Sequence, residues 1–194
     1  MRHDGDAEWI ERRAMAEPMT DSTAALSADF ERARADFHHL LGFVGGDEWK
    51  KPTSGTRWTN EQLLFHMVFG YMVVQRLLIL VYVFSRLPDC ASRGFAWALN
   101  AGTPLFDRIN YYGTNLAALV YNRRRMAAKL DRVIDALQRS LARRDQKALS
   151  RGMHFPNRWD PYFRDYMTLS DVYGYPGKHY DHHRRQLALA RTAR

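Results

Sequence analysis

The segment HYDHHRRQL, residues 179–187, places three histidines within five positions and follows them with two arginines. Histidine is a common metal ligand and the usual proton carrier near neutral pH, so a metal site, an acid–base site and a basic surface are all open. His179 and His183 stand four residues apart, so on a helix their side chains share one face, about 5–6 Å apart at Cβ. This spacing predicts that both can bind one metal ion, whereas His182 is displaced around the helix.

A third metal ligand is needed, and His66 is the candidate. The stretch WTNEQLLFH predicts a helix that Thr59 caps and Gln62 completes as a capping box. His66 then lies about 10 Å along this helix, and His183 lies about 12 Å before the expected end of the last helix near Arg191. In an antiparallel pair of helices the histidines lie at the same level. A lone buried histidine more often bonds a backbone carbonyl, but a second pair at matching depth favours a metal site.

Three imidazoles that leave coordination positions open are typical of catalytic zinc sites. Zinc is the expected metal, although nickel, iron and manganese also accept imidazole. Such an ion would polarise a substrate or lower the pKa of a bound thiol or water. Gln186 is expected to support a ligand histidine at its other nitrogen. Trp58 is expected at the mouth of a substrate cavity. Arg184 and Arg185 either orient an anionic group or lie on a solvated helix face, which is the interpretation we favour. No catalytic residue is assigned.

Four helical patterns position these residues. Apolar side chains at steps of three and four predict helices over residues 26–44, 60–86 and 103–144. The fourth helix starts after Thr168 or, if Pro176 breaks the pattern, at that proline, and it runs to about residue 191. No strand pattern is present. We therefore predict an all-α four-helix bundle whose third and fourth helices are joined by a long connection that contains Phe155, Trp159, Tyr162 and Phe163.

The length of the chain suits one domain. We expect residues 1–20 to form a disordered leader, with Met19 as an alternative start, and residues 21–194 to form a single domain. The one cysteine, Cys90, excludes an internal disulfide and fits a reducing cytoplasm. It is expected in a loop, with no neighbouring histidine to support catalysis. No signal peptide pattern is present, so the expected compartment is the cytoplasm.

The net charge of +8 raises the question of nucleic acid, but 24 arginines and 5 lysines are scattered through the helical patterns. A GC-rich genome explains the same bias, so no nucleic acid is expected. The stretch 63–84 is long enough to cross a bilayer. His66, Gln75 and Arg76 inside it favour a buried core helix, so no membrane is expected. A small-molecule substrate is the expected partner, and a homodimer stays open.

The stretches RWTNEQLLFHM and HYDHHRRQL together resemble the DinB/YfiT-like superfamily of metal-binding four-helix bundles, over about residues 21–189. The resemblance implies metal ligands at His66, His179 and His183. It also implies chemistry on small molecules, since members include S-transferases that use mycothiol or bacillithiol, a mycothiol-dependent isomerase and hydrolases of toxic natural products. We expect a thiol-dependent S-transferase in which the metal activates mycothiol or water. The alternatives are a hydrolase or another biosynthetic or resistance enzyme, and a protein that binds a metal or small molecule without catalysis.

Overall fold

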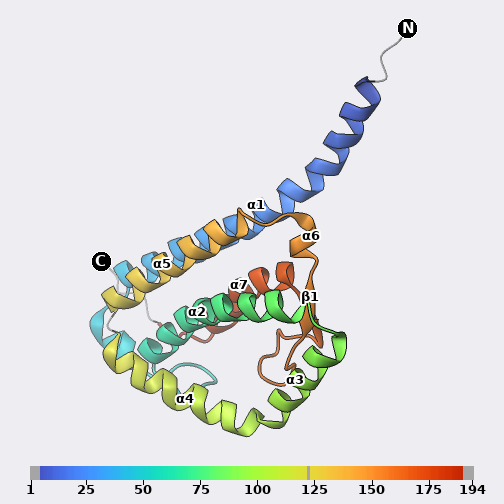
Figure 1. Ribbon diagram of the computed structural model, residues 1–194. Helices are drawn as coiled ribbons and strands as arrows, with labels where there is room; N and C mark the ends of the chain where they lie inside the picture. Colours follow the sequence, from blue (N-terminus) through green and yellow to red (C-terminus); the bar gives the residue numbers. More distant parts are fainter. Residues whose placement is uncertain (1–4, 122, 190–194) are drawn as a thin grey trace.

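Helices make up most of the structure, a computed structural model that describes residues 5–121 and 123–189. Four of the helices, α1, α2, α5 and α7, form a four-helix bundle, and α3 and α4 lie as a second layer along one side of it (Figure 1). The predicted all-α bundle is therefore confirmed. The elements are α1 Gly5–Phe43, the 3-10 helix η1 Gly46–Lys50, α2 Asn60–Phe84, α3 Asp89–Ala101, α4 Thr103–Val120, α5 Arg123–Leu141, α6 Gln146–Leu149, β1 Gly152–His154, β2 Tyr166–Thr168 and α7 Leu169–Arg184.

Helix α2 begins at the predicted capping box. The Thr59 hydroxyl accepts a hydrogen bond from the Gln62 backbone N–H, and the Gln62 side chain accepts one from the Thr59 N–H. By length and composition, α2 is the one helix in the described part of the chain that could cross a membrane. It lies instead in the bundle against α4, α5 and α7, with Leu63, Met67 and Tyr71 fully buried. The first part of α2 is thus buried as predicted for a core helix, whereas Ile79, Tyr82 and Val83 near its end are exposed.

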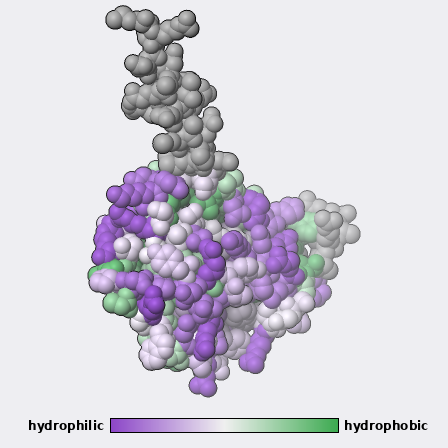
Figure 2. All heavy atoms as spheres, turned by 90° about the vertical axis from the view of Figure 1, so that its right-hand side faces the viewer, coloured by the Kyte–Doolittle hydropathy of each residue, from purple (hydrophilic) through white to green (hydrophobic). Residues whose placement is uncertain are grey.

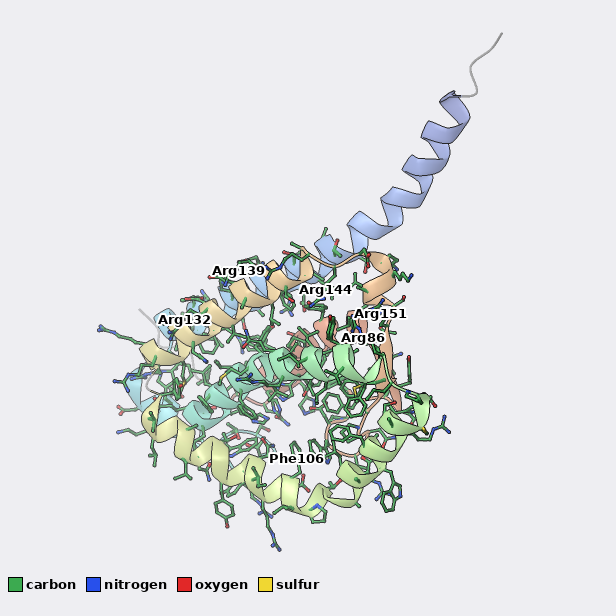
Figure 3. All side chains as sticks on the ribbon, viewed as in Figure 1. Arg86, Phe106, Arg132, Arg139, Arg144 and Arg151 are labelled. Atoms are coloured by element: carbon green, nitrogen blue, oxygen red, sulfur yellow. The ribbon has the colours of Figure 1, made fainter. Side chains whose placement is uncertain are left out.

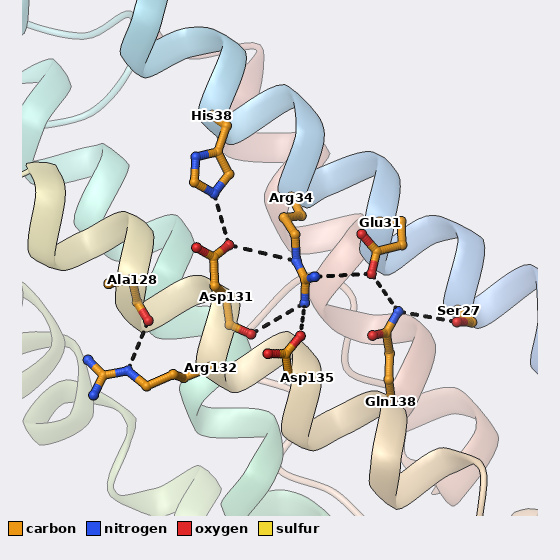
Figure 4. Close-up of polar contacts among 9 residues, drawn as sticks. All are labelled: Ser27, Glu31, Arg34, His38, Ala128, Asp131, Arg132, Asp135 and Gln138. Carbon is orange, nitrogen blue, oxygen red and sulfur yellow. Dashed lines mark hydrogen bonds and ion pairs between the residues drawn. The ribbon is translucent and has the colours of Figure 1, made fainter.

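A polar seam joins α1 to α5 on the outside of the bundle (Figure 4). Arg34 forms ion pairs with Asp131 and Asp135 of α5, and His38 Nε2 lies 2.9 Å from Asp131 Oδ1. Further along, Gln138 donates to Glu31 at 2.8 Å. The contacts fix how the two helices lie against each other, while their apolar stripes meet in the core.

The region between α2 and α5 differs from the prediction. Residues 89–101 form α3 where a loop was expected, so Cys90 lies exposed on a helix. The third predicted helix, 103–144, is two helices, because the chain becomes extended at Tyr121. The sequence YNRRR at this break contains neither glycine nor proline, so no breaker signals it. Helix α4 begins at Thr103, whose hydroxyl donates a hydrogen bond to the Asn100 carbonyl at 2.8 Å.

The segment between α5 and α7, residues 142–168, is called the connecting segment below. It contains α6 and an antiparallel pair of strands in which Met153 faces Met167. The expectation of no strands is wrong here, because strands of three residues are too short to show an alternating pattern. Helix α7 begins after Thr168, which forms a capping box with Asp171, and Pro176 lies inside it. The first of the two predicted starts is right, but the helix ends at Arg184 rather than near residue 191.

The N-terminal part of α1 projects beyond the bundle (Figure 1). The segment expected as a disordered leader is helical from Gly5 onward, and the division into leader and domain stays a prediction. The face that carries α3, β1 and α6 is mostly hydrophilic with small apolar patches (Figure 2). The outer face of α4 differs, because large apolar side chains on it are 61–83% exposed: Leu105, Ile109, Tyr112, Leu116 and Leu119.

Candidate metal centre

Three histidines from two helices converge beside a cavity. His66 lies in the second turn of α2, and His179 and His183 lie in the last turns of α7, which runs antiparallel to α2. The two helix ends are tied together, since the Asn60 side chain bonds both the N–H and the carbonyl of Ala188. We call His66, His179 and His183 the histidine triad. The structure brings these three predicted ligands together, and their binding of a metal stays a prediction.

The geometry of the triad fits one metal ion. One ring nitrogen from each histidine lies within 4.8 Å of the others, and the ring centroids are 4.5–5.0 Å apart. A tetrahedral zinc ion with Zn–N bonds of about 2.0–2.1 Å holds its nitrogens about 3.3–3.4 Å apart. Side-chain shifts of up to about 1 Å would therefore complete the coordination. His182 is not part of this set, in agreement with its predicted displacement around the helix.

Burial keeps the imidazoles neutral. Burial, together with repulsion from His183, lowers the pKa of His66 to about 3. Burial likewise lowers the pKa of His183 to about 4, although a hydrogen bond from its ring to Gln186 acts in the opposite direction. The pKa of His179 falls well below its ordinary value, again mainly through burial and then through its two partners. Near neutral pH each ring therefore offers an unprotonated nitrogen, which metal binding requires.

Partners at the second ring nitrogen orient two of the three ligands. His183 Nδ1 donates to Gln186 Oε1 at 2.7 Å, which leaves its Nε2 free for a metal and places Gln186 where it was expected. His66 Nδ1 lies 3.4 Å from the hydroxyl of Thr114, a buried residue of α4. The Nδ1 of His179 has no hydrogen-bond partner and is buried. Trp58 packs on His66 with ring centroids 4.5 Å apart and thereby covers the triad on one side.

The two arginines after the triad lie away from it. Arg184 Nε donates to Asp36 Oδ2 at 2.8 Å and so links α7 to α1, and Tyr180 donates to the same carboxylate oxygen. Arg185 is the exposed C-cap of α7. Neither arginine lines the cavity. Their positions therefore fit packing and solvation better than contact with a substrate.

The triad opens into a cavity of about 310 Å³ between α2, α7, the α3–α4 layer and the connecting segment. Phe106 projects from α4 toward this interior (Figure 3). Trp58 lines the cavity beside the triad, and its predicted place at the mouth stays a prediction. Most of the remaining wall is aromatic or aliphatic: Phe69, Val73, Leu77, Leu80, Phe95, Leu99, Phe106, Met153, Phe155, Trp159, Tyr162, Phe163 and Tyr175.

Asp160 is a residue of the site that the sequence analysis missed. Its Oδ2 accepts a hydrogen bond from the Tyr175 hydroxyl at 2.8 Å and lies 4.0 Å from His179 Nε2. Its Oδ1 accepts from the Tyr162 N–H. Burial raises the pKa of this carboxyl group, against the effect of these bonds. A lone carboxylate inside the aromatic stretch RWDPYF is the signal that could have identified it.

Gly70 is the second residue that was missed. It lies in the middle of α2, where a Cβ atom would come within 2.5 Å of His179 Nδ1. A glycine inside an apolar helix lowers the stability of the helix and often marks a place where another group packs closely against it. Gly70 could therefore have been identified from the sequence. Thr114 could not be identified in this way, because its contact with His66 depends on how α4 folds back over α2.

Comparison with known proteins agrees with this geometry. A sequence model described as the DinB superfamily matches residues 29–187, a range that contains the whole triad. No curated protein and no solved structure matches the chain. The match extends over most of the sequence and over all four helices of the bundle. The chain therefore belongs to the DinB superfamily.

Proposed function

We propose that this protein is a metal-dependent enzyme that acts on small molecules and transfers a thiol to an electrophilic substrate. The histidine triad would hold one divalent ion, with zinc as the first choice. The observation that carries this proposal is the position of the triad. Its neutral nitrogens lie at the wall of a cavity, where a purely structural site would have them enclosed by packed side chains.

A bound divalent ion would lower the pKa of a thiol, so that the thiolate forms near neutral pH. The residues of the chain have separate tasks around it. Gln186 and Thr114 hold the rings of His183 and His66 in fixed orientations. Asp160 Oδ2 faces the triad and could accept the proton that the thiol releases, since burial makes this carboxylate more basic than usual. A low-molecular-weight thiol such as mycothiol fits this chemistry, and a reducing cytoplasm is the compartment that would supply it.

A hydrolase is the second candidate. The same ion would activate water, and Asp160 would again take up the proton. The presence of a carboxylate 4.0 Å from a ligand histidine favours this alternative over binding without catalysis.

The first test is the metal content of protein purified without an affinity tag, followed by turnover. The metal-loaded protein is incubated with monochlorobimane and, in turn, mycothiol, bacillithiol and glutathione, and the fluorescent adduct is quantified. We expect adduct formation above the uncatalysed rate with at least one thiol, and its loss in His183→Ala. His38→Ala, which changes a histidine on the α1–α5 seam, is the matched control and should keep both metal and activity.

Asp160→Asn separates the tasks of the metal and the carboxylate. We expect this variant to retain the ion while its turnover number falls by about 100-fold, within the range usual for a lost proton acceptor. Fully loaded protein that accelerates neither thiol transfer nor ester hydrolysis would contradict the proposal and leave a binding protein.

A further inference from the structure

The wall of the cavity has an unusual charge balance for this protein. The chain carries 29 lysines and arginines, yet none is among the described residues that line the cavity. Asp160 is the one carboxylate in that wall. A ligand with a negative charge remote from the metal would therefore leave water for a surface that offers no cation and one repelling group. Such a ligand is disfavoured wherever the metal itself does not hold its charge.

Aromatic rings on the wall are held in place by their neighbours. Phe106 of α4 stacks on Trp159 with ring centroids 4.0 Å apart and planes 9° from parallel. The indole N–H of Trp159 donates to the Leu99 carbonyl at 2.8 Å, so the ring cannot rotate without losing this bond. Also on this wall, Phe163 packs on Tyr175, whose hydroxyl donates a hydrogen bond to Asp160. Fixed rings of this kind present flat faces before any ligand arrives, which favours planar ligands.

The size of the cavity further limits which ligands can bind. Its volume of about 310 Å³ lies at the small end of ordinary ligand pockets. Polar groups of the wall lie near the triad at Asp160, Tyr162 and His182, whereas Val73, Leu77 and Leu80 follow α2 away from His66. A ligand that fills this space has a reactive polar end at the triad and an apolar body beyond it.

We propose that the substrate of this site is an uncharged, planar and largely apolar molecule of about the size of a substituted naphthalene. Its reacting end lies at the triad, and its ring system lies along α2 against the aromatic wall formed by α3, α4 and the connecting segment. That the ligand is a substrate rests on the proposed function. The shape and charge of the ligand follow from the wall alone.

Two fluorescent probes with the same rings test the inference. N-phenyl-1-naphthylamine is uncharged, and 8-anilino-1-naphthalenesulfonate adds a sulfonate to it. Each probe is titrated into the full-length protein with and without zinc. Because exposed apolar or basic surfaces also attract such probes, only the fluorescence that a cavity-filling variant removes is counted. Val73→Trp is that variant, since Val73 lines the cavity seven residues beyond His66 on α2.

We expect the uncharged probe to bind in the cavity at least about tenfold more tightly than the sulfonate, and Val73→Trp to weaken its binding at least about tenfold with the metal content unchanged. Leu99→Trp is a second cavity-filling variant on α3, in case the first does not fold. Leu119→Trp places the same side chain on the outer face of α4 and should have no effect. Asp160→Asn should improve binding of the sulfonate.

Cavity binding of the sulfonate as tight as that of the uncharged probe would overturn the inference, as would probe binding that neither cavity-filling variant weakens. The two proposals fail separately. Probe binding without any turnover would refute the enzyme and keep the ligand class, whereas turnover of thiol and electrophile without such probe binding would refute the ligand class alone.

Discussion

Replacing Gly70 with alanine adds one methyl group beside His179, a proposed metal ligand, and changes nothing else. The new Cβ would lie 2.5 Å from Nδ1 and 2.9 Å from Cε1 of His179. Carbon atoms in ordinary contact are about 3.5–4.0 Å apart, so the imidazole has to move by about 1 Å. The Nδ1 has no hydrogen bond to oppose this movement, but the ring is buried and packs against both other histidines. The added methyl group therefore displaces the His179 ring relative to His66 and His183.

The magnitude follows from the tolerance of metal coordination. Metal–ligand distances in proteins hold to about 0.2 Å, so a ring displaced by about 1 Å loses or strains its bond. We expect zinc affinity to fall by about 10–100-fold, which corresponds to about 1.4–2.7 kcal/mol. The metal-free fold should suffer much less, because alanine in a helix interior is more favourable than glycine by about 1 kcal/mol. Metal affinity and stability should thus respond differently.

Competition with a chromophoric chelator measures the zinc affinity, and thermal unfolding with and without zinc measures the stability. Gly113→Ala is the matched control, because Gly113 lies in α4 with nothing within 4 Å of an added Cβ. Its zinc affinity should equal that of the unmodified protein. If Gly70→Ala binds zinc as tightly as this control does, His179 does not coordinate from the position described, and the reasoning fails.

Each alanine variant of the triad should lose most of its zinc, while its circular dichroism spectrum stays helical because the apolar core and not the metal holds the bundle together. His182→Ala is the control and should retain zinc. Full zinc occupancy in His66→Ala would contradict the proposed site. In the metal-free protein, the pKa values of about 3 and about 4 for His66 and His183 lie below the 6.5 of an ordinary histidine. The unfolded state therefore takes up protons first, so stability is complete above about pH 6.5 and is lost as the pH falls toward 4. Urea midpoints should show this loss, and the double variant with glutamine at both positions should flatten it; an equally steep loss in that variant would refute the assignment. Asp36→Ala should destabilise the fold by about 1–3 kcal/mol, because the hydroxyl of the fully buried Tyr180 loses its acceptor. Zinc affinity should not change, and a parallel loss of zinc would show that the α1–α7 link also positions the triad.

The grouping of His66, His179 and His183 could be predicted because it depends on local signals. The capping residues Thr59 and Thr168 place α2 and α7 on the chain, and helical spacing then gives the level of each histidine. The expected end of α7 near Arg191 was wrong by seven residues, about two helical turns, so the level of His183 estimated from that end was wrong by about 10 Å. The signals that held were the cap at Thr59 and the four-residue spacing of His179 and His183.

The remaining features depend on contacts between distant segments. Arg184 pairs with Asp36 across 148 positions, and the sequence has no signal for that partner. Thr114 reaches His66 only because α4 folds back over α2. Apolar residues keep the helical spacing across the break between α4 and α5, and the break has no glycine or proline, so periodicity alone predicts one helix. The partner of Arg184, the contact of Thr114 and this break all depend on tertiary packing.

The ligands and most of the cavity wall come from different parts of the chain. The triad lies on α2 and α7, whereas Phe95, Phe106 and Trp159 lie on α3, α4 and the connecting segment. The wall can therefore change by substitution in residues 89–120 and 142–168, with Thr114 kept, while the helices that carry the triad stay constant. The same separation makes the protein a scaffold for engineering, in which a library confined to these two segments would explore new ligands of the cavity around an unchanged triad.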